Sequence, residues 1–433
     1  MSKVTVNDSK RIRAMLPVNA VNNGPAITGT SQIRSNAKEY AALEIPFSRI
    51  HDANFNSNYG GPHIVDIHVV FPDFDADIND PASYDFALTD RYLKHLQDCG
   101  SEVFYRLGAS IEHAPVKYGT KKPKDFDRWA EICEHIIAHY TEGWANGYTW
   151  QIRYWEIWNE PDMCDDDSPL ESRLTWGGTA KEFYEFYRTV SIRLKKRFPH
   201  LKIGGPALCY RRDTWTDHFL EALSEGERAP LDFFSWHLYT TDPHEVSQHT
   251  KYLREKLNRY GYPDCELNCN EWNYVRNWTD QFVYSVETII GEKGAAFAAA
   301  CMCEGQNAAS DMMMYYDVRP CTFCGMFDFY TLRPLKTYYV FEAFRDLRRC
   351  KTQVESLSDD RDIYTVSAAD DSHAVTVICY YSENDGAPAK TVTVEGLRKG
   401  VTARLLDREH TMDVVDFDGE ITLQPNSVLV LNS

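Results

Sequence analysis

Apolar positions along the chain change from one period to another in a regular order. From about residue 17 to residue 345, short apolar runs are followed by stretches in which apolar residues recur every three or four positions, as in strand–helix units. Eight runs have strand length: Val18–Asn23, Pro46–Ala53, Glu102–Gly108, Tyr154–Trp158, Lys202–Gly204, Phe233–Tyr239, Glu266–Glu271 and Met312–Tyr316. Eight such units predict an α/β fold, a (β/α)8 TIM barrel, over residues 17–345.

Two of the helical stretches carry clear end signals. Thr179 and Glu182 stand three residues apart at the start of an amphipathic stretch that runs to Phe198, and this spacing predicts a capping box. Another helix is expected over Val246–Tyr260, where Gly261 can end it because glycine readily adopts a left-handed conformation.

The pattern changes after about Leu347. Alternating, β-branched runs separated by turn residues predict a C-terminal antiparallel β-sandwich over residues 346–433. The N-terminal segment 1–16 contains the run VTV, which could add an edge strand to this second domain.

Charge and composition narrow the function. The 433 residues carry 46 basic and 64 acidic side chains, a formal net charge of −18, which argues against nucleic acid or an anionic membrane as a partner. The start has no apolar signal-peptide region, and the longest apolar run, Gly294–Cys303, is about half as long as a bilayer span. We therefore expect a cytoplasmic protein, and its twelve cysteines should be reduced. A homo-oligomer is compatible with the sequence.

Two glutamates stand at the ends of predicted strands. Glu160 is the last residue before the proline of the run YWEIWNEP, and Glu271 ends ELNCNE three strands later. The C-terminal ends of barrel strands build the active site in this architecture, and two carboxylates facing one cavity suit the hydrolysis of a glycosidic bond. One would act as general acid and the other as nucleophile, with Asn159 donating to a sugar hydroxyl.

The motifs WEIWNEP and NEWNY, on an eightfold strand–helix pattern, resemble those of the retaining glycosidases of clan A, and within them glycoside hydrolase family 39, which contains β-xylosidases and α-L-iduronidases. The resemblance covers about residues 17–345 and implies that Glu160 is the acid/base, Glu271 the nucleophile and Asn159 the contact to the 2-hydroxyl. It also implies a β-sandwich beside the barrel.

Further site residues follow from the same resemblance. Ser48–His51 is similar to the second-strand Arg-x-His of the family, which implies that His51 contacts the sugar. His237 and Tyr239 stand on the sixth strand, where the clan keeps partners of the nucleophile. Four aromatic residues near the strand ends are candidates for a platform under a sugar ring, and Trp272 is among the expected substrate-binding residues: Trp158, Trp236, Tyr239 and Trp272.

The expected protein is therefore a retaining, β-xylosidase-like glycoside hydrolase that acts on short oligosaccharides or glycosides without a cofactor or metal. Two alternatives stay open. The first is a metal-dependent barrel hydrolase that uses the residues able to bind a divalent cation: His51, His63, Asp66, His68 and His237. If residues 63–68 form a strand, Asp66 and His68 share one face and His63 points to the other. The second alternative is a sugar-binding protein without catalysis.

Overall fold

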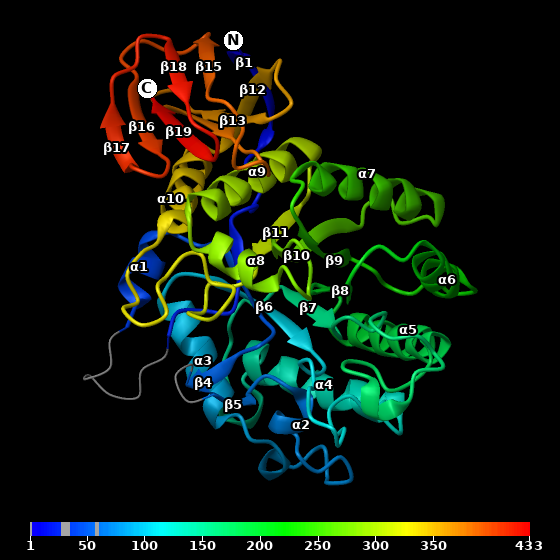
Figure 1. Ribbon diagram of the computed structural model, residues 1–433. Coiled ribbons are helices and arrows are strands. Elements are labelled where there is room, and N and C mark those ends of the chain that lie inside the picture. Colours follow the sequence, from blue (N-terminus) through cyan, green and yellow to red (C-terminus); the bar gives the residue numbers. More distant parts are fainter. Residues whose placement is uncertain (1, 27–34, 57–59) are drawn as a thin grey trace.

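The computed structural model describes residues 2–26, 35–56 and 60–433. Eight parallel strands close into a barrel in the order β10-β11-β2-β3-β6-β7-β8-β9, which confirms the predicted TIM barrel (Figure 1). Every strand run expected from the sequence overlaps one of them. The bounds are β2 Ala20–Asn22, β3 Phe47–Ile50, β6 Glu102–Leu107, β7 Tyr154–Ile157, β8 Lys202–Leu208, β9 Phe233–Thr240, β10 Glu266–Tyr274 and β11 Met312–Tyr315.

Helices surround the barrel and connect its strands. Their bounds are α1 Ala37–Ala42, α2 Ile67–Val70, α3 Ala87–Asp98, α4 Phe126–Thr141, α5 Ala180–Arg197, α6 Asp213–Ser224, α7 His244–Arg259, α8 Phe282–Ile289, α9 Glu292–Ala308 and α10 Lys336–Arg349. The capping box is present, because Thr179 and Glu182 exchange side-chain and backbone hydrogen bonds at the start of α5. Helix α7 ends just before Gly261, whose φ of +82° is left-handed.

The inside of the barrel is built in layers. At the N-terminal end of the strands, seven apolar side chains form a separate core cluster: Ala20, Phe47, Phe104, Tyr154, Phe233, Met312 and Met314. Two residues further along three of these strands stand Arg49, Glu156 and Ser235, all fully buried. Side chains two apart share one face of a strand, so a polar layer lies directly above the apolar one.

The C-terminal strands form a second unit with the N-terminal strand. One nine-stranded sheet has the order β17-β16-β19-β14-β13-β12-β1-β15-β18 and curls around its own apolar cluster. The bounds of its strands are β1 Ser2–Ala14, β12 Thr352–Ser358, β13 Ile363–Ala369, β14 Ala374–Tyr380, β15 Lys390–Glu395, β16 Thr402–Leu406, β17 Thr411–Val415, β18 Glu420–Leu423 and β19 Ser427–Asn432. The antiparallel C-terminal domain is thus confirmed, apart from the parallel pairing of β1 with β15. Strand β1 joins this sheet between β12 and β15, and not at an edge as expected.

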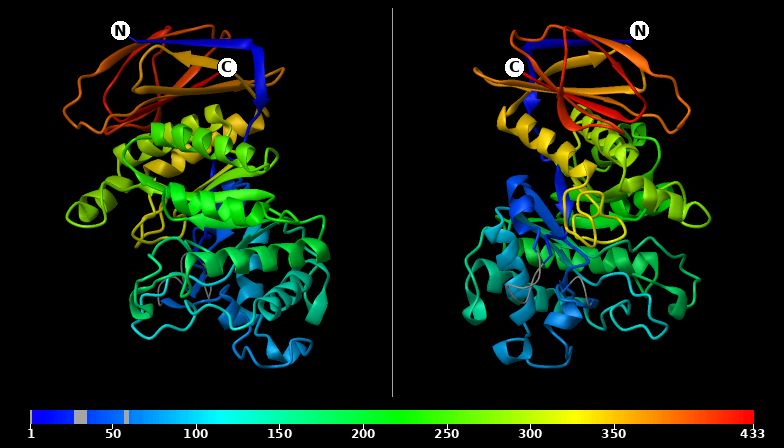
Figure 2. Two further views of the ribbon diagram at one scale, coloured as in Figure 1. Left: turned by 90° about the vertical axis from the view of Figure 1, so that its right-hand side faces the viewer. Right: turned by 60° about the vertical axis from the view of Figure 1, so that its left-hand side comes forward.

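Helices α9 and α10 lie between the curled sheet and the barrel (Figure 2). Helix α9 is buried along nearly its whole length, which accounts for the apolar run Gly294–Cys303. All twelve cysteines are free thiols. Among the described residues, no helix combines the length and the apolar character that crossing a membrane requires.

The segment around Asp66 does not form the strand considered for the alternative metal site. Asp66 precedes the short helix α2, and His68 lies within that helix. Asp66 instead accepts hydrogen bonds from Arg106 (2.5 Å) and from the hydroxyl of Ser110 (3.0 Å), so its carboxylate is committed to an internal ion pair.

Candidate active site

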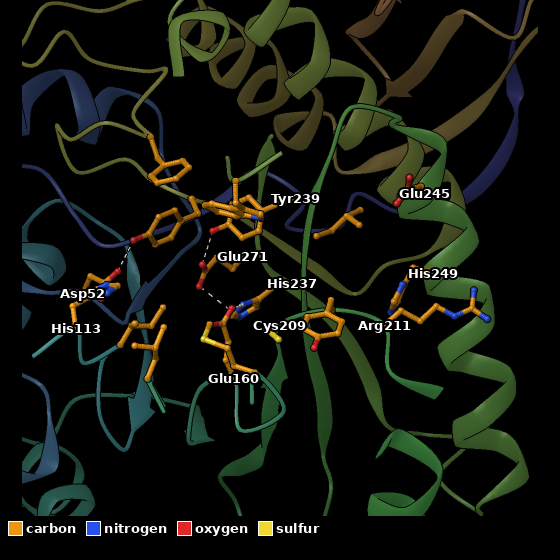
Figure 3. A pocket seen from close by; sticks show the side chains of 18 of the residues that line it. Asp52, His113, Glu160, Cys209, Arg211, His237, Tyr239, Glu245, His249 and Glu271 are labelled. Atoms are coloured by element: carbon orange, nitrogen blue, oxygen red, sulfur yellow. Dashed lines mark hydrogen bonds and ion pairs between the residues drawn. The ribbon is translucent and has the colours of Figure 1, made fainter. Parts of the chain in front are cut away.

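A cleft of about 1140 Å³ opens at the C-terminal end of the barrel strands. Glu160 and Glu271 both line it, and Figure 3 shows them near its centre, pointing toward one another. Asp52 and His113 lie on one side of the pair, while Cys209, Arg211, His249 and Glu245 lie on the other side. The cleft therefore extends away from the two carboxyl groups in two directions.

Glu160 is held over the barrel by a strained turn after β7. Trp158 and Glu160 both have left-handed backbones, with φ of 74° and 49°, which is costly for residues with side chains. The neighbouring chain segments stabilise this turn, because the Trp158 amide donates to Leu107 and the Glu160 amide donates to Ala207. Thr175 also donates to the Glu160 carbonyl. The turn aims the carboxyl group of Glu160 into the cleft.

Glu271 owes its orientation to a bulge in β10. The register between β9 and β10 shifts between Cys269 and Glu271, so Asn270 has no partner in the ladder. A bulge of this kind re-aims the side chains around it. Asn270 consequently donates to Glu156 inside the barrel, and the next side chain, Glu271, also faces inward.

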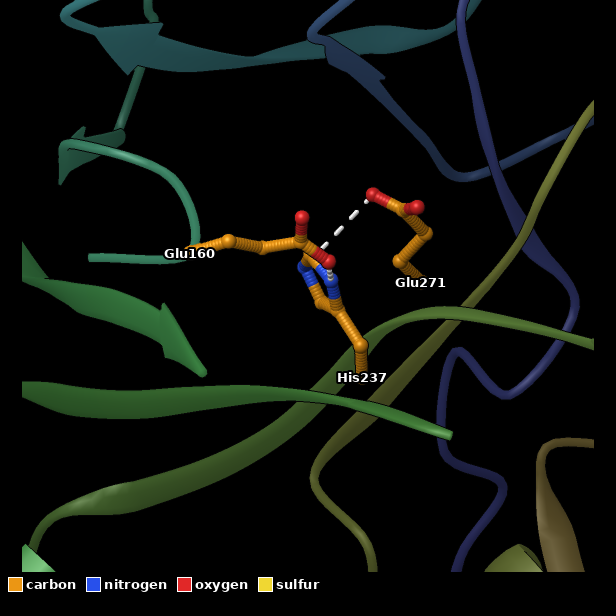
Figure 4. A group of neighbouring side chains, drawn as sticks. All are labelled: Glu160, His237 and Glu271. Atoms are coloured by element: carbon orange, nitrogen blue, oxygen red, sulfur yellow. Dashed lines mark hydrogen bonds and ion pairs between the residues drawn. The ribbon is translucent and has the colours of Figure 1, made fainter. Parts of the chain in front are cut away.

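His237 lies between the two carboxyl groups (Figure 4). Its Nδ1 is 2.7 Å from Oε1 of Glu160, and its Nε2 is 3.5 Å from Oε2 of Glu271. One ligand atom from each of the three residues lies within 4.8 Å of the others. Retaining glycosidases have carboxyl groups about 5 Å apart and inverting ones about 6.5–9.5 Å, so the separation fits a retaining enzyme.

Burial perturbs all three groups. It raises the pKa of Glu160 to about 8, with a further rise from the charge of Asp52 and an opposing effect of Arg49. Burial also raises the pKa of Glu271 to about 7, although His237, Arg49 and Tyr239 act against it. Burial lowers the pKa of His237 to about 4, so its ring is neutral at neutral pH. The two carboxyl groups titrate as a coupled pair around neutrality.

Arg49 supports the site from below. This fully buried guanidinium donates to Glu156 (2.7 Å), Asn159 (2.6 Å), Asn22 (3.1 Å) and Glu271 (3.2 Å). Arg49 is the arginine of the Arg-x-His motif, from which only His51 was expected to reach the sugar, and Glu156 was not among the predicted site residues. Their signal in the sequence is a charged residue inside an apolar strand, which requires a buried partner.

The structure brings the other predicted residues to different depths. Tyr239 lines the cleft, and its hydroxyl donates to Oε1 of Glu271 at 2.5 Å. Asn159 is fully buried; its Oδ1 accepts from Arg49, while its Nδ2 has no partner among the described residues. His51 is also buried and lies beneath the wall of the cleft, against Arg106 and Asp52. Its neighbour Asp52 reaches the cavity instead.

The predicted sugar platform at Trp272 requires correction. Trp272 follows the inward-facing Glu271 on β10 and therefore points out of the barrel, where it packs against Phe297 and Tyr315 with 1% of its surface exposed. Trp278 lines the cleft instead, in the loop after β10. It is 57% exposed and stacks on Phe282.

Metal-ligand geometry is restricted to the centre of the site. In residues 2–26, 35–56 and 60–433, the one group able to hold a metal ion is Glu160, His237 and Glu271. The guanidinium of Arg49, 3.2 Å from Glu271, would repel a cation there. The alternative ligand set is not assembled, because Asp66 pairs with Arg106 and His68 packs edge-on against Tyr118.

Comparison with known proteins gives a family and a fold. The model of the family described as glycosyl hydrolases family 39 matches residues 61–394. Two curated relatives are β-xylosidases. The one from Geobacillus stearothermophilus is 26% identical over 258 residues, which are 52% of this chain and 47% of the relative. The one from Caldicellulosiruptor saccharolyticus is 27% identical over 172 residues, 37% of this chain and 32% of the relative. The chain thus matches less than half the length of these relatives.

Solved structures resemble the whole chain. A glucosidase from Croceicoccus marinus has a TM-score of 0.77 at 19% identity, over 100% of this chain and 98% of that one. An α-L-arabinofuranosidase from Thermotoga maritima has a TM-score of 0.67 at 12% identity and covers both chains completely. At these identities, the likeness shows a shared fold.

Proposed function

The chain belongs to glycosyl hydrolase family 39, and from this membership we propose that it is a retaining glycoside hydrolase of the β-xylosidase type. The observation that carries the proposal is the separation of Glu160 and Glu271 across His237 at the end of the barrel. The names of the two curated relatives support a β-xyloside as substrate.

In the first step, Glu271 attacks the anomeric carbon. The bond from this carbon to the glycosidic oxygen breaks, and the leaving oxygen takes the proton of Glu160. The product is a glycosyl ester of Glu271 and a free alcohol. In the second step, the carboxylate of Glu160 removes a proton from water, whose oxygen attacks the same carbon and releases Glu271. Two inversions at one carbon retain its configuration.

The hydrogen bonds of the site suit these two roles. Glu271 receives hydrogen bonds from Tyr239 and Arg49, which favour its ionised form. Glu160 has one neighbour at Oε1, the Nδ1 of His237, and we assign the single proton of the neutral ring to this nitrogen. Oε2 of Glu160 has no partner among the described residues, so it is the atom that carries the proton for the leaving group.

Asn159 is the proposed contact to the 2-hydroxyl. Its Nδ2 is a buried donor without a partner among the described residues, next to Glu160, while Arg49 fixes the orientation of the amide through Oδ1. A buried donor left unpaired is costly, and a sugar hydroxyl would satisfy it. Contacts to this hydroxyl strengthen in the transition state.

The test is hydrolysis of a panel of 4-nitrophenyl glycosides, with a chelator present. The panel consists of the β-xyloside, α-L-arabinoside, β-glucoside, β-galactoside and α-L-iduronide. We expect turnover of at least one neutral β-glycoside, and NMR of the first product should show the β-anomer. Glu271→Gln should abolish this activity, whereas Glu255→Gln, on the exposed face of α7, should keep it.

Two outcomes would contradict the proposal. Activity that the chelator removes would indicate a metal-dependent hydrolase. Binding of a glycoside without turnover by the wild-type protein, at any pH between 4 and 10, would indicate a sugar-binding protein.

A further inference from the structure

The cleft has a charged end that the two-carboxylate mechanism does not use. Asp52 lines the cavity directly after β3, on the opposite side of Glu160 and Glu271 from Cys209 and Arg211 (Figure 3). It is 9% exposed. An acidic side chain at this depth is rare unless it has partners or a ligand.

The carboxylate of Asp52 is fixed in its charged form. Tyr316 donates a hydrogen bond to Oδ2, and Oδ1 lies 3.5 Å from Nε2 of His51 and 3.8 Å from Nδ1 of His63. Although burial opposes ionisation, these neighbours and Arg319 keep the pKa of Asp52 well below its usual range. The group is a permanent negative charge with acceptor capacity toward the cavity.

Contacts connect this end of the cleft to the nucleophile. The ring of Tyr316 lies 6.4 Å from the ring of Tyr239, whose hydroxyl bonds Glu271. Asp52 is also close enough for its charge to raise the pKa of Glu160. Under the proposed function, Glu271 binds the anomeric carbon of the glycone. Cys209 lies close enough to the acid Glu160 to be affected by its charge, and we take the leaving group to extend past Glu160 toward Cys209, which places the glycone ring between Glu271 and Asp52.

The cation nearest to Asp52 is already neutralised. The Nη2 of Arg319 lies 3.2 Å from the buried Asp317, and its Nη1 donates to the backbone carbonyl of Asp52. Arg319 also lines the cleft, but its one positive charge stands against two carboxylates, those of Asp317 and Asp52. This end of the cleft therefore keeps a net negative charge, which opposes the entry of an anionic sugar.

We propose that Asp52 selects neutral glycones, accepting hydrogen bonds from the sugar hydroxyls opposite the anomeric carbon and excluding uronic acids. This inference rests on the proposed function, which requires a glycone ring next to Glu271. A carboxylate can accept from two adjacent hydroxyls, and like charges placed side by side oppose binding.

The experiment compares 4-nitrophenyl β-xyloside, β-glucoside and β-glucuronide. The wild-type kcat/KM should be at least about 100-fold higher for a neutral glycoside than for the glucuronide. Asp52→Asn should lower kcat/KM for the neutral glycosides by about 10–100-fold, because hydrogen bonds to charged groups weaken when the charge is lost. The ratio of kcat/KM for the neutral glycoside to that for the glucuronide should fall by about 10-fold. Glu245→Gln removes a carboxylate from the other arm of the cleft and should leave the preference unchanged.

Equal turnover of glucuronide and neutral glycosides by the wild type would overturn the proposal, as would unchanged neutral kcat/KM in Asp52→Asn. The wild-type comparison needs no variant, so it decides the matter even where Asp52→Asn fails to fold. If no glycoside is hydrolysed, the proposed function fails, and calorimetry then tests Asp52 separately. A xylo-configured iminosugar should bind at least about 10-fold more tightly than its glucuronic acid analogue, and the reverse order would refute the assignment.

Discussion

In the proposed mechanism, replacing Glu160 by Gln removes the proton that the leaving group needs and keeps the size of the side chain. The structure gives the scale of this loss. At pH 7, a carboxyl group with a pKa of about 8 is about 90% protonated, whereas the ordinary value of 4.5 would leave about 0.3% protonated. Burial therefore increases the population of the acid form about 300-fold, and the amide of glutamine cannot replace this acid.

The effect should depend on the leaving group. For a xylobiose or alkyl β-xyloside, Glu160→Gln should lower kcat/KM by about 10²–10⁴-fold, the usual contribution of general acid catalysis. For 2,4-dinitrophenyl β-xyloside the loss should be below about 10-fold, because this leaving group needs no proton. The second step also loses its base, so kcat for the dinitrophenyl substrate should fall, and azide should restore it by forming the β-glycosyl azide.

Steady-state kinetics with both substrates, with and without azide, measure these effects. The wild type and Glu255→Gln serve as controls and should not respond to azide. Equal losses of kcat/KM on the two substrates, or no rescue by azide, would refute the role of Glu160 as acid and base. The reasoning from its unpartnered Oε2 would then be wrong as well.

Three further outcomes follow from the geometry. The proposed mechanism needs Glu271 ionised and Glu160 protonated. We therefore expect kcat/KM to fall below the raised pKa of Glu271 and above the pKa of Glu160, with an optimum near pH 7–8. An optimum below pH 5 in a pH–rate profile would contradict the role of burial. Arg49→Met leaves the buried carboxylates of Glu156 and Glu271 without their cation. Urea denaturation should show a free energy of unfolding lower by about 3–5 kcal/mol, and a loss below about 1 kcal/mol would contradict this expectation. Trp278 lines the cleft, so Trp278→Ala should raise KM with little change in Tm. Trp272 is buried, so Trp272→Ala should lower the free energy of unfolding by about 3–5 kcal/mol. A raised KM in Trp272→Ala and a loss of stability in Trp278→Ala would place the sugar contact at Trp272.

The barrel could be predicted because its strands are buried on both faces. Such strands are short apolar runs, and each is followed by a helical period, so all eight were visible in the sequence. The second domain was predicted with less detail. Strands β17 and β18 are half exposed and contain few consecutive apolar residues, so no clear alternation marks them.

The site was harder to predict wherever it depends on contacts between distant segments. Glu160 and Glu271 stand near the C-terminal ends of their strands and could be singled out from the sequence. The place of Asp52 depends on Tyr316, which is 264 residues away, and no local pattern connects the two. The outward position of Trp272 follows from the period of two along a strand, whereas the inward turn of both Asn270 and Glu271 depends on a bulge that only strand pairing reveals.

The difference between the two glutamates arises from their neighbours. Both carboxyl groups are buried, and burial alone would leave both protonated near neutral pH and the enzyme without a nucleophile. Glu271 receives two donors, Tyr239 and Arg49, and one of them carries a full positive charge. Glu160 has the neutral ring of His237 at one oxygen, and no partner among the described residues at the other. The first proton to leave the pair therefore comes from Glu271. We infer that the donors around Glu271, above all Arg49 inside the barrel, make it the nucleophile and leave Glu160 as the acid.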